Sequence, residues 1–547
     1  MVSTFRRRYH RPAAALLAVG ILAAPIVIGA CGGDEPAGTP SPRVTAQPSA
    51  EATASPLDAE QVIDLAAQDA ITVVWGADKG DFLNDLPLLA GGDVNGDGLD
   101  DLLIGARFGD GPDNSRTDSG EAYVVFGSES LPEEVDLAEG QEDVTIYGAS
   151  GQSVRSPSGD QLGFSGLVAD VNGDGIGDII LGSPFVVRED SGEGAGAVYV
   201  FFGDSDWDEE IDLAGREADV TLLGADASAF FGDSLASTDV TGDGVDDLIV
   251  GATFAAGQRG AAYVMFGGTE LAGTKDMSRQ EFDAAIFGAE VYDELGDAVA
   301  GGDVNDDGFG DIILTAEAAD GPDNGRSVAA EVYVVYGSAD LSGQLEIAEG
   351  RQDITIYGAE PNDTIGFNIA TGDVNDDGVD DLLIVARLAD GPDNTVSEAG
   401  EVHVIFGSSD LAAVIDLAAG GPPYLFGADP ADQLGGSLAT ADLDGDESVE
   451  LLAGTGSGDG PSNSRADGGE VYALGAANLE GAVNVVETPL LLAVYGGNED
   501  DRLGAALTVA DLNGDGAPEL IMLALEGDGP DGSREGAGQV YIVTPAS

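Results

Sequence analysis

An aspartate-rich nonapeptide recurs seven times between residues 93 and 519, at intervals of 64 to 77 residues. The copies begin at Asp93, Asp170, Asp239, Asp303, Asp373, Asp442 and Asp511. Self-similarity at a near-fixed period is typical of repeat architectures, in which each unit buries its apolar faces against its neighbours. We therefore expect one array of seven similar units.

Short β-branched and aromatic runs, bounded by Gly and Asp, surround every nonapeptide. Examples are Asp101–Ala106, Ala122–Gly127 and Val144–Ala149 in the first unit. This composition predicts strands, and runs that are apolar on both faces fit sheets that stack face to face. The 83 glycines support many tight turns. Each unit is predicted to hold four strands, one before the acidic loop, such as Ser437–Thr440, and three after it.

The order of strand types is shifted at the two ends of the repeat array. It begins with a copy of the fourth type at 71–77 and ends with a copy of the third type at 539–544. In a ring the first strand would complete the last blade and remove an exposed sheet edge, whereas a linear solenoid would leave both ends incomplete. The sequence thus favours an all-β fold over residues 62–547: a seven-bladed β-propeller of four-stranded blades, closed by an N-terminal strand that completes the last blade.

Oxygen-bearing side chains occupy positions 1, 3, 5 and 9 of the nonapeptide, as Asp93, Asn95, Asp97 and Asp101 do in the first copy. Position 7 is free to offer its carbonyl. Calcium takes six to eight oxygen ligands in flexible geometry, so we expect up to seven Ca²⁺ ions. A plain hairpin is the alternative, because Asp-Gly and Asn-Gly are ordinary turn formers. A turn needs no carboxylate at position 9, however, and unpaired carboxylates this close together repel one another.

The seven copies are not equivalent. Thr241 takes position 3 of the third copy, Glu447 replaces the position-6 glycine of the sixth, and Pro518 precedes Glu519 at the end of the seventh. Copies one, two, four and five are therefore expected to be the most regular and the sixth the least. The candidate metal ligands are Asp93, Asn95, Asp97, Leu99, Asp101, Asp170, Asn172, Asp174, Ile176, Asp178, Asp239, Thr241, Asp243, Val245, Asp247, Asp303, Asn305, Asp307, Phe309, Asp311, Asp373, Asn375, Asp377, Val379, Asp381, Asp442, Asp444, Asp446, Ser448, Glu450, Asp511, Asn513, Asp515, Ala517 and Glu519.

Residues 1–30 have the pattern of a secretory signal: basic residues up to Arg11, then an apolar run over Ala13–Ile28. A membrane-spanning helix is the alternative, but the run is short and contains Pro25. The Ile-Gly-Ala-Cys ending resembles a bacterial lipobox, which implies cleavage before Cys31 and its acylation. Residues 31–61 are then a disordered tether from the acylated Cys31, and the protein is expected to be exported and lipid-anchored on the extracytoplasmic side of a membrane.

Acidic residues outnumber basic ones by 101 to 20, which gives a net charge of −81. This charge excludes nucleic acid as a partner and disfavours docking onto an anionic membrane surface. Two readings of the acidity stay open: carboxylates that bind cations, or a solvated surface suited to saline surroundings. The single cysteine lies in the signal segment, so no disulfide is expected in the folded part.

Phe231-Gly232 before Ser234–Ala236, Gly251-Ala252 after the acidic loop, and the loops themselves resemble FG-GAP repeats of the integrin α-subunit propeller. The resemblance covers about residues 62–547. It implies a seven-bladed propeller with calcium loops between the first and second strands of its blades. No integrin leg region accompanies the repeats, so integrin signalling is not implied.

Three functions stay open at this stage. The first is a binding or adhesion module on the cell surface for an unknown protein or glycan ligand. The second is an enzyme, or a propeller associated with one, acting on glycans or lipids. The third is a structural surface protein with a saline-adapted acidic surface. Asp-Gly-Pro insertions either line one rim or simply form turns. They occupy 110–114, 320–324, 390–394, 459–463 and 528–532.

No catalytic residue is assigned. The folded part has no cysteine nucleophile and no Gly-x-Ser-x-Gly motif. His403 replaces the tyrosine of sibling strands, so it is predicted to be a packed strand residue. The prediction from sequence is therefore that the chain is not an enzyme.

Overall fold

The computed structural model describes residues 59–67, 72–80, 88–153, 156–188, 194–476, 479–534 and 536–545. The predicted signal segment, Cys31 and residues 31–58 of the predicted tether lie outside the described residues. Among the described residues, no helix has the length and apolar character that a membrane crossing requires.

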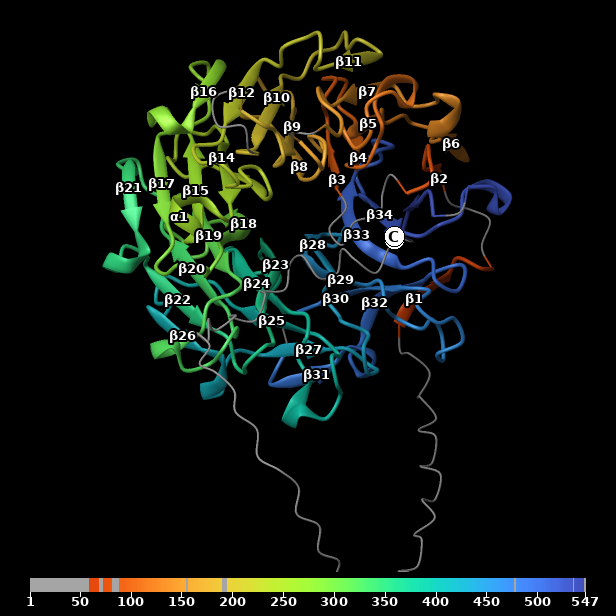
Figure 1. Cartoon of the computed structure of the whole chain (residues 1–547). Coiled ribbons are helices and arrows are strands. Elements are labelled where there is room, and N and C mark those ends of the chain that lie inside the picture. Colours follow the sequence, from red (N-terminus) through yellow and green to blue (C-terminus); the bar gives the residue numbers. More distant parts are fainter. Residues whose placement is uncertain are drawn as a thin grey trace, which may run out of the picture. The chain divides into compact units, whose positions relative to one another are not determined.

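Seven β-sheets stand in a ring (Figure 1). In blade 3, the strands β13 (Leu235–Thr238), β14 (Asp247–Ala252), β15 (Ala261–Met265) and β17 (Ala284–Phe287) pair antiparallel in sequence order. The other six sheets repeat this order, and each first strand contacts the first strands of both neighbouring blades around the whole circuit. The predicted seven-bladed β-propeller is thereby confirmed.

The strands of the other blades occupy equivalent places. The first strands are β3 (Leu89–Gly92), β8 (Gly166–Ala169), β18 (Leu295–Gly302), β23 (Ile365–Gly372), β28 (Ser437–Ala441) and β33 (Leu503–Ala510). The second strands are β4 (Asp101–Ala106), β9 (Asp178–Ser183), β19 (Asp311–Ala316), β24 (Asp381–Ala386), β29 (Glu450–Thr455) and β34 (Glu519–Ala524). The third strands are β5 (Glu121–Val125), β10 (Ala197–Phe201), β20 (Glu331–Val335), β25 (Glu401–Ile405), β30 (Glu470–Gly475) and β35 (Gln539–Val543). The fourth strands are β7 (Val144–Tyr147), β12 (Val220–Leu223), β22 (Ile354–Tyr357), β27 (Tyr424–Phe426), β32 (Leu490–Tyr495) and β2 (Thr72–Trp75).

Each sheet has a fifth, outermost strand, so the predicted four strands per blade are one too few. The connection between the third and fourth strands of one blade reaches back and pairs in parallel with the fourth strand of the preceding blade, as β11 (Glu210–Asp212) does with β7. These segments are short and partly exposed, so they show no apolar alternation that would reveal a strand. The others are β16 (Gly273–Asp276), β21 (Gly343–Glu346), β26 (Val414–Asp416), β31 (Ala482–Asn484) and β6 (Glu134–Asp136). On blade 6 the same place is taken by β1 (Ala59–Asp64), which precedes β2 in the chain.

The N-terminal strands enter two different blades. β2 pairs antiparallel with β35, with Thr72 opposite Ile542 and Trp75 opposite Gln539. β1 pairs in parallel with β32 of blade 6. The N-terminal segment therefore supplies the fifth strand of blade 6 and the fourth strand of blade 7.

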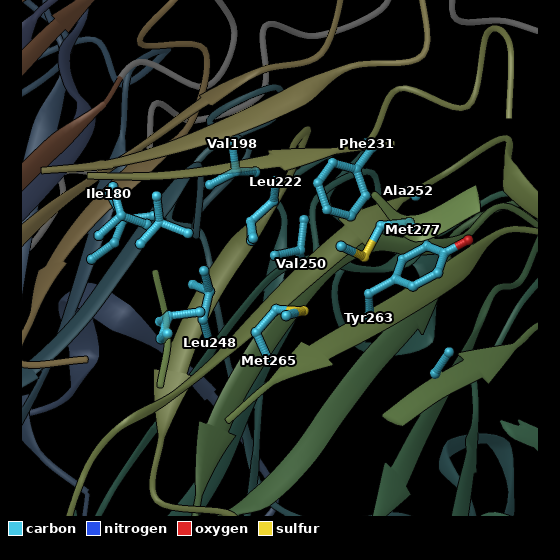
Figure 2. Packing of buried hydrophobic residues seen from close by; sticks show 14 of the residues in the cluster. Ile180, Val198, Leu222, Phe231, Leu248, Val250, Ala252, Tyr263, Met265 and Met277 are labelled. Carbon is cyan, nitrogen blue, oxygen red and sulfur yellow. The ribbon is translucent and has the colours of Figure 1, made fainter. Parts of the chain in front are cut away.

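The core lies between the blades, because both faces of each sheet are apolar. Every residue of the second strand is buried in all seven blades. Figure 2 shows the junction of blades 2 and 3, where Val198 and Leu222 meet Val250 and Tyr263. Close approach demands glycine at places: a Cβ on Gly251 would lie 2.2 Å from the carbonyl oxygen of Gly296 in the next blade.

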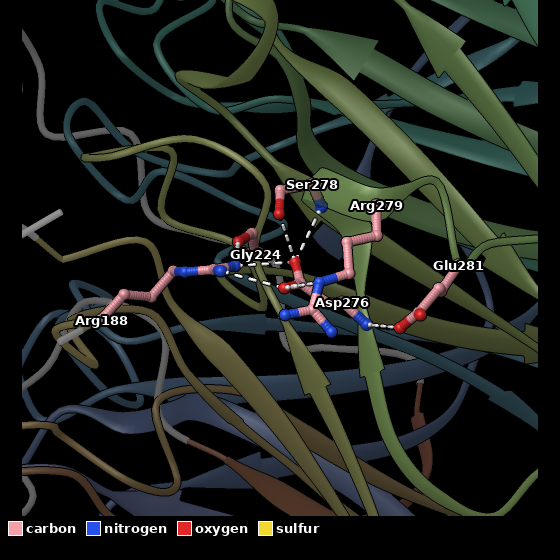
Figure 3. A network of polar contacts seen from close by, with 6 residues as sticks. All are labelled: Arg188, Gly224, Asp276, Ser278, Arg279 and Glu281. Atoms are coloured by element: carbon pink, nitrogen blue, oxygen red, sulfur yellow. Dashed lines mark hydrogen bonds and ion pairs between the residues drawn. The ribbon is translucent and has the colours of Figure 1, made fainter. Parts of the chain in front are cut away.

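An arginine ties the fifth strand to the blade that it joins. In blade 2, Nη1 of Arg188 lies 2.8 Å from Oδ1 of Asp276 at the end of β16 and also donates to the carbonyl of Gly224 at 2.9 Å (Figure 3). Asp276 in turn accepts from the Ser278 N–H and caps the short helix η4 (Met277–Arg279). The side chains of Arg188 and Asp276 are only 13% and 6% exposed. The guanidinium holds the pKa of Asp276 well below its usual range.

The same pair recurs in five other blades, as Arg116–Asp212, Arg259–Glu346, Arg326–Asp416, Arg465–Asp64 and Arg534–Asp136. In blade 5 both members are replaced together: Val396 stands in the arginine's place in the loop and Asn484 in the acid's place at the end of β31. Most of these arginines follow an Asp-Gly-Pro insertion, whose Asp110 accepts from the Asp118 N–H at 2.9 Å. In the described structure these insertions therefore form turns that position the arginine.

We expect Arg188→Met to lower the free energy of unfolding by about 1–3 kcal/mol, because Asp276 is left shielded from water with only the exposed Arg279 side chain beside it, at 3.4 Å. Urea unfolding near neutral pH measures the change. Arg216→Met is the matched control, because Arg216 and Asp208 are 46% and 74% exposed and such a pair contributes little. A decrease as large in the control would contradict a special role for the shielded pair.

The effect of Arg188→Met on stability should also depend on pH. Because the pKa of Asp276 is lowered on folding, the stabilisation is complete above the unfolded value of about 3.9 and is lost as the pH falls toward the folded value. The difference between wild type and Arg188→Met should therefore shrink between about pH 5 and about pH 2. A difference that stays constant over this range would show that packing, and not the ion pair, sets the effect.

Candidate metal centres

The seven acidic loops lie at one end of the ring, each between the first and second strands of its blade. Position 1 follows the first strand directly, and position 9 is the first residue of the second strand in every blade. The structure thus places all predicted site residues in strand–loop–strand turns. Positions 1 and 9 are fixed by the sheet, and the residues between them form the turn.

The loop backbone wraps around the carboxylate at position 1. In the first loop, Oδ1 of Asp93 accepts from the N–H groups of Gly96 at 2.6 Å and Asp97 at 3.2 Å, and Oδ2 accepts from Gly98 at 2.8 Å. Gly96 and Gly98 adopt φ of +74° and +89°, which suits glycine. The bond from the position-5 N–H to the first aspartate recurs in the other six loops. The oxygen-rich loops therefore share one ordered conformation.

The carboxylate at position 9 is buried beneath the loop. Asp101 is 1% exposed and accepts from the Val94 N–H at 3.0 Å, the Gly127 N–H at 2.9 Å and Nδ2 of Asn95 at 3.3 Å. Burial raises the pKa of Asp101 to about 7, although the hydrogen bonds from the Gly127 and Val94 N–H groups lower it. The charges of Asp97 and Asp93 raise this pKa further. The ionised form of this carboxyl group is therefore destabilised by burial and by the neighbouring loop carboxylates.

The other position-9 groups behave alike. Burial raises the pKa of Asp178 and Asp247 to about 6, and of Asp311, Asp381 and Glu450 to about 7. Burial also raises the pKa of Glu519. The shared cause is burial beside other loop carboxylates.

The sixth loop brings three carboxylates together. One oxygen each of Asp442, Asp444 and Glu450 lies within 4.8 Å of the others. Asp444 supplies a carboxylate at position 3, where Asn95 and its counterparts supply an amide, and the longer Glu450 side chain extends from position 9. In the third loop, the hydroxyl of Thr241 lies 3.4 Å from Oδ1 of Asp239. The relative regularity of the seven sites remains a prediction.

The residues fit a hard divalent cation. Every side-chain ligand atom on offer is an oxygen, the group at position 9 is a buried carboxyl, and the neighbouring loop carboxylates add to the rise that burial causes in the pKa of that group. Calcium bound there would supply the positive charge that offsets this repulsion. The side chains at positions 1, 3, 5 and 9 and the carbonyl at position 7 are the groups that would hold it.

A second acidic cluster, at the opposite end of the same hairpins, was missed by sequence reasoning. Asp297 lies near the start of β18, Glu317 directly follows β19, and their carboxyl groups are hydrogen-bonded to each other. Asp233 precedes β13; its Oδ2 accepts from the Thr253 hydroxyl, and its Oδ1 is buried without a hydrogen-bond partner among the described residues. Burial raises the pKa of Asp233 to about 8, and burial and the charge of Glu317 raise that of Asp297.

The sequence did contain a sign of this cluster, because an acidic residue replaces an aromatic residue at equivalent positions of different blades. Asp233 and Asp297 stand where Phe164 and Phe367 stand in blades 2 and 5, directly after an apolar-Gly pair. Acidic residues are so abundant in this chain that the exchange did not stand out.

Partly exposed aromatic rings adjoin the cluster. Phe164, Phe185, Phe230 and Phe254 follow one another with centroid distances of 6.0, 5.1 and 5.2 Å. The guanidinium carbon of Arg107 lies 4.7 Å from the centroid of Phe164. This aromatic strip leads to Thr253 and Asp233, so apolar and acidic groups share one end of the ring.

His403 is a buried strand residue, 4% exposed, in β25. Its Nε2 lies 3.1 Å from Oε2 of Glu401. In the third strand of blade 1, the Tyr123 hydroxyl donates to Glu121 in the same way. The histidine therefore takes the packing place of the sibling tyrosine.

The FG-GAP repeat model matches residues 88–125, 162–201, 231–265 and 503–543, within blades 1, 2, 3 and 7. Human phosphatidylinositol-glycan-specific phospholipase D is 27% identical over 379 residues, which cover 66% of this chain and 43% of that protein. Integrin alpha pat-2 of Caenorhabditis briggsae is 31% identical over 241 residues, which cover 42% of this chain and 17% of that protein. The chain thus spans less than half the length of these relatives.

Among solved structures, a rhamnogalacturonan lyase of Bacillus licheniformis is similar with a TM-score of 0.41 and 13% identity, covering 87% of this chain and 73% of that one.

The prediction that the chain is not an enzyme is contradicted by the relatives. They include phosphatidylinositol-glycan-specific phospholipase D from human, cattle and rat, at 25% to 29% identity. A lack of nucleophile motifs therefore does not separate a chain with these repeats from enzymes. The chain carries FG-GAP repeats, is homologous to integrin α chains, and folds as a seven-bladed β-propeller.

Proposed function

We propose that this chain is a calcium-binding propeller that acts as a binding or adhesion module on the cell surface. The observation that carries the proposal is the set of seven loops, each with a buried carboxyl at position 9 beneath an oxygen-rich turn. The exported, lipid-anchored location predicted from the segment ending at Cys31 belongs to the same proposal.

The end of the ring opposite the loops is the candidate ligand face. Oδ1 of the buried Asp233 carboxyl has no hydrogen-bond partner among the described residues, and Asp297 and Glu317 share a hydrogen bond that a ligand hydroxyl or amide would replace. The aromatic strip beside them supplies partly exposed rings that stack on apolar faces of a ligand. A protein or glycan ligand has both kinds of group.

A second candidate is an enzyme, or a propeller associated with one, acting on glycans or lipids. Two observations favour it: the phospholipase D relatives, and the Asp297–Glu317 pair. A carboxyl group that keeps its proton beside a second carboxyl is suited to general acid–base chemistry. The two candidates differ in whether a bound glycan or lipid is released unchanged.

Calcium should raise the melting temperature of the chain, and a chelator should reverse the rise. Ions bound only by the native state stabilise it, by about 2.7 kcal/mol per site at one hundred times the dissociation constant. Differential scanning calorimetry with and without calcium measures this. Asp97→Asn, which weakens one site, should reduce the rise, whereas Asp340→Asn, at an exposed acid outside the loops, should not. An identical melting temperature in calcium and in chelator would disprove the proposed sites.

Asp297→Asn and Phe254→Ala should abolish binding on glycan and protein arrays while leaving the calcium-induced rise in melting temperature intact. The physical reason is that these residues lie at the opposite end of the hairpins from the loops. Asp340→Asn again serves as the matched control. Product analysis on bound glycans and on phosphatidylinositol-glycan lipids separates the candidates: turnover that Asp297→Asn removes supports the enzyme, and retained intact ligand supports the binding module.

A further inference from the structure

Neighbouring acidic loops are joined to each other across the blades. The backbone N–H at position 8 of one loop donates to the carbonyl at position 1 of the preceding loop. The four bonds are Asp100 to Asp511 at 3.1 Å, Gly177 to Asp93 at 2.8 Å, Gly310 to Asp239 at 2.8 Å and Asp380 to Asp303 at 3.1 Å. At four of the seven junctions, the position-1 residue of one loop is thus hydrogen-bonded to the loop of the next blade.

Two aspartates at position 8 complete a second bond in the reverse direction. Oδ2 of Asp100 accepts from the N–H of Asp511 at 2.9 Å, and Oδ2 of Asp380 accepts from the N–H of Asp303 at 2.9 Å. Both backbone polar groups of Asp511 and of Asp303 are therefore held by one residue of the next blade. A displacement of a position-1 residue on binding a cation moves the neighbouring loop with it.

The loops also pack tightly against each other. The side chain at position 7 of one loop lies against position 4 of the preceding loop, as Leu99 does against Gly514 and Ile176 against Gly96. A Cβ on Gly514 would lie 2.3 Å from Cδ2 of Leu99, and one on Gly96 would lie 3.0 Å from Cδ1 of Ile176. Position 7 is also the predicted carbonyl ligand, so the contact joins one ligand-bearing residue to the adjacent loop.

We propose, on the basis of the calcium sites proposed above, that adjacent loops bind cations cooperatively, with Asp100 and Asp380 as the residues that couple them. Coupling of this kind is reciprocal: an ion in the seventh loop strengthens binding in the first, and the reverse. Among the described residues, the sixth loop lacks these bonds on both sides, and the bond is also missing between the second and third loops, where position 8 is Asp246. Position 8 is Val449 in the sixth loop and Pro518, which has no N–H, in the seventh. No hydrogen bond joins either residue to the preceding loop in the described part of the chain, so the sixth site binds independently.

One of the two tryptophans provides a probe of a single site. Nε1 of Trp207 donates to the carbonyl of Val94, in the first loop, at 2.9 Å. Terbium, a calcium analogue, emits when a nearby tryptophan transfers excitation to it. Titration of the full chain with terbium, excited through tryptophan, therefore reports binding at the first loop, and Trp207→Phe should remove the signal.

Asp515→Ala, which removes a ligand of the seventh loop, should weaken terbium binding at the first loop roughly 5-fold or more. Asp446→Ala, the same change in the sixth loop, is the matched control and should leave it unchanged. In an Asp100→Ala background, Asp515→Ala should have a smaller effect, because the bond from the Asp511 N–H to the Asp100 side chain is lost while the backbone bond between the loops remains. Asp515→Asn replaces Asp515→Ala if the alanine variant does not fold, as judged by its melting transition.

Equal effects of Asp515→Ala and Asp446→Ala, or an undiminished effect of Asp515→Ala in the Asp100→Ala background, would overturn the coupling while leaving the calcium sites in place. A wild-type chain that gives no tryptophan-sensitised emission, and no calcium-induced rise in melting temperature, would overturn the calcium sites and the coupling together.

Discussion

Every sheet of this molecule has two apolar faces, and neither can be left in water. The second strand of each blade is buried along its whole length. A sheet of this kind needs a neighbour on each side, and a closed ring is the arrangement that gives all seven sheets two neighbours. The pairing of β2 with β35 follows from the same need, because without it blade 7 would lack its fourth strand.

Hydrophobic contacts between sheets are not directional, so hydrogen bonds and ion pairs set the orientation of one blade relative to the next. Two belts of such bonds run around the ring. On the outside, the fifth strand and its arginine join each blade to its neighbour, as Arg188 and Asp276 do. At the loop end, position 8 joins neighbouring loops, as Asp100 and Asp511 do. In the described structure the arginine pair is missing in blade 5, and the loop bond is missing on both sides of blade 6 and between blades 2 and 3.

Acidic residues serve three different purposes here, and their surroundings decide which. At position 9 a carboxyl group is buried under a turn rich in other oxygens, which suits a cation. At the end of the fifth strand a carboxylate such as Asp276 is shielded beside a guanidinium, which keeps it ionised. At Asp233 and Asp297 a carboxyl group is enclosed without either partner, and burial raises its pKa. The rest of the net charge of −81 remains as surface.

The sequence by itself determined the number of blades, the four main strand types, the fourth-type strand at the start of the array and the oxygen positions of every loop. These features repeat at one period and depend on neighbours within a few residues, so side-chain type and spacing suffice to reveal them. Only the tertiary structure decided the fifth strands, the arginine pairs such as Arg188–Asp276, the Asp233–Asp297–Glu317 cluster and the bonds between loops. Each of these joins residues that lie far apart in the chain, and whether a carboxylate there meets a guanidinium, a second carboxyl or a loop N–H depends on which blade packs beside it.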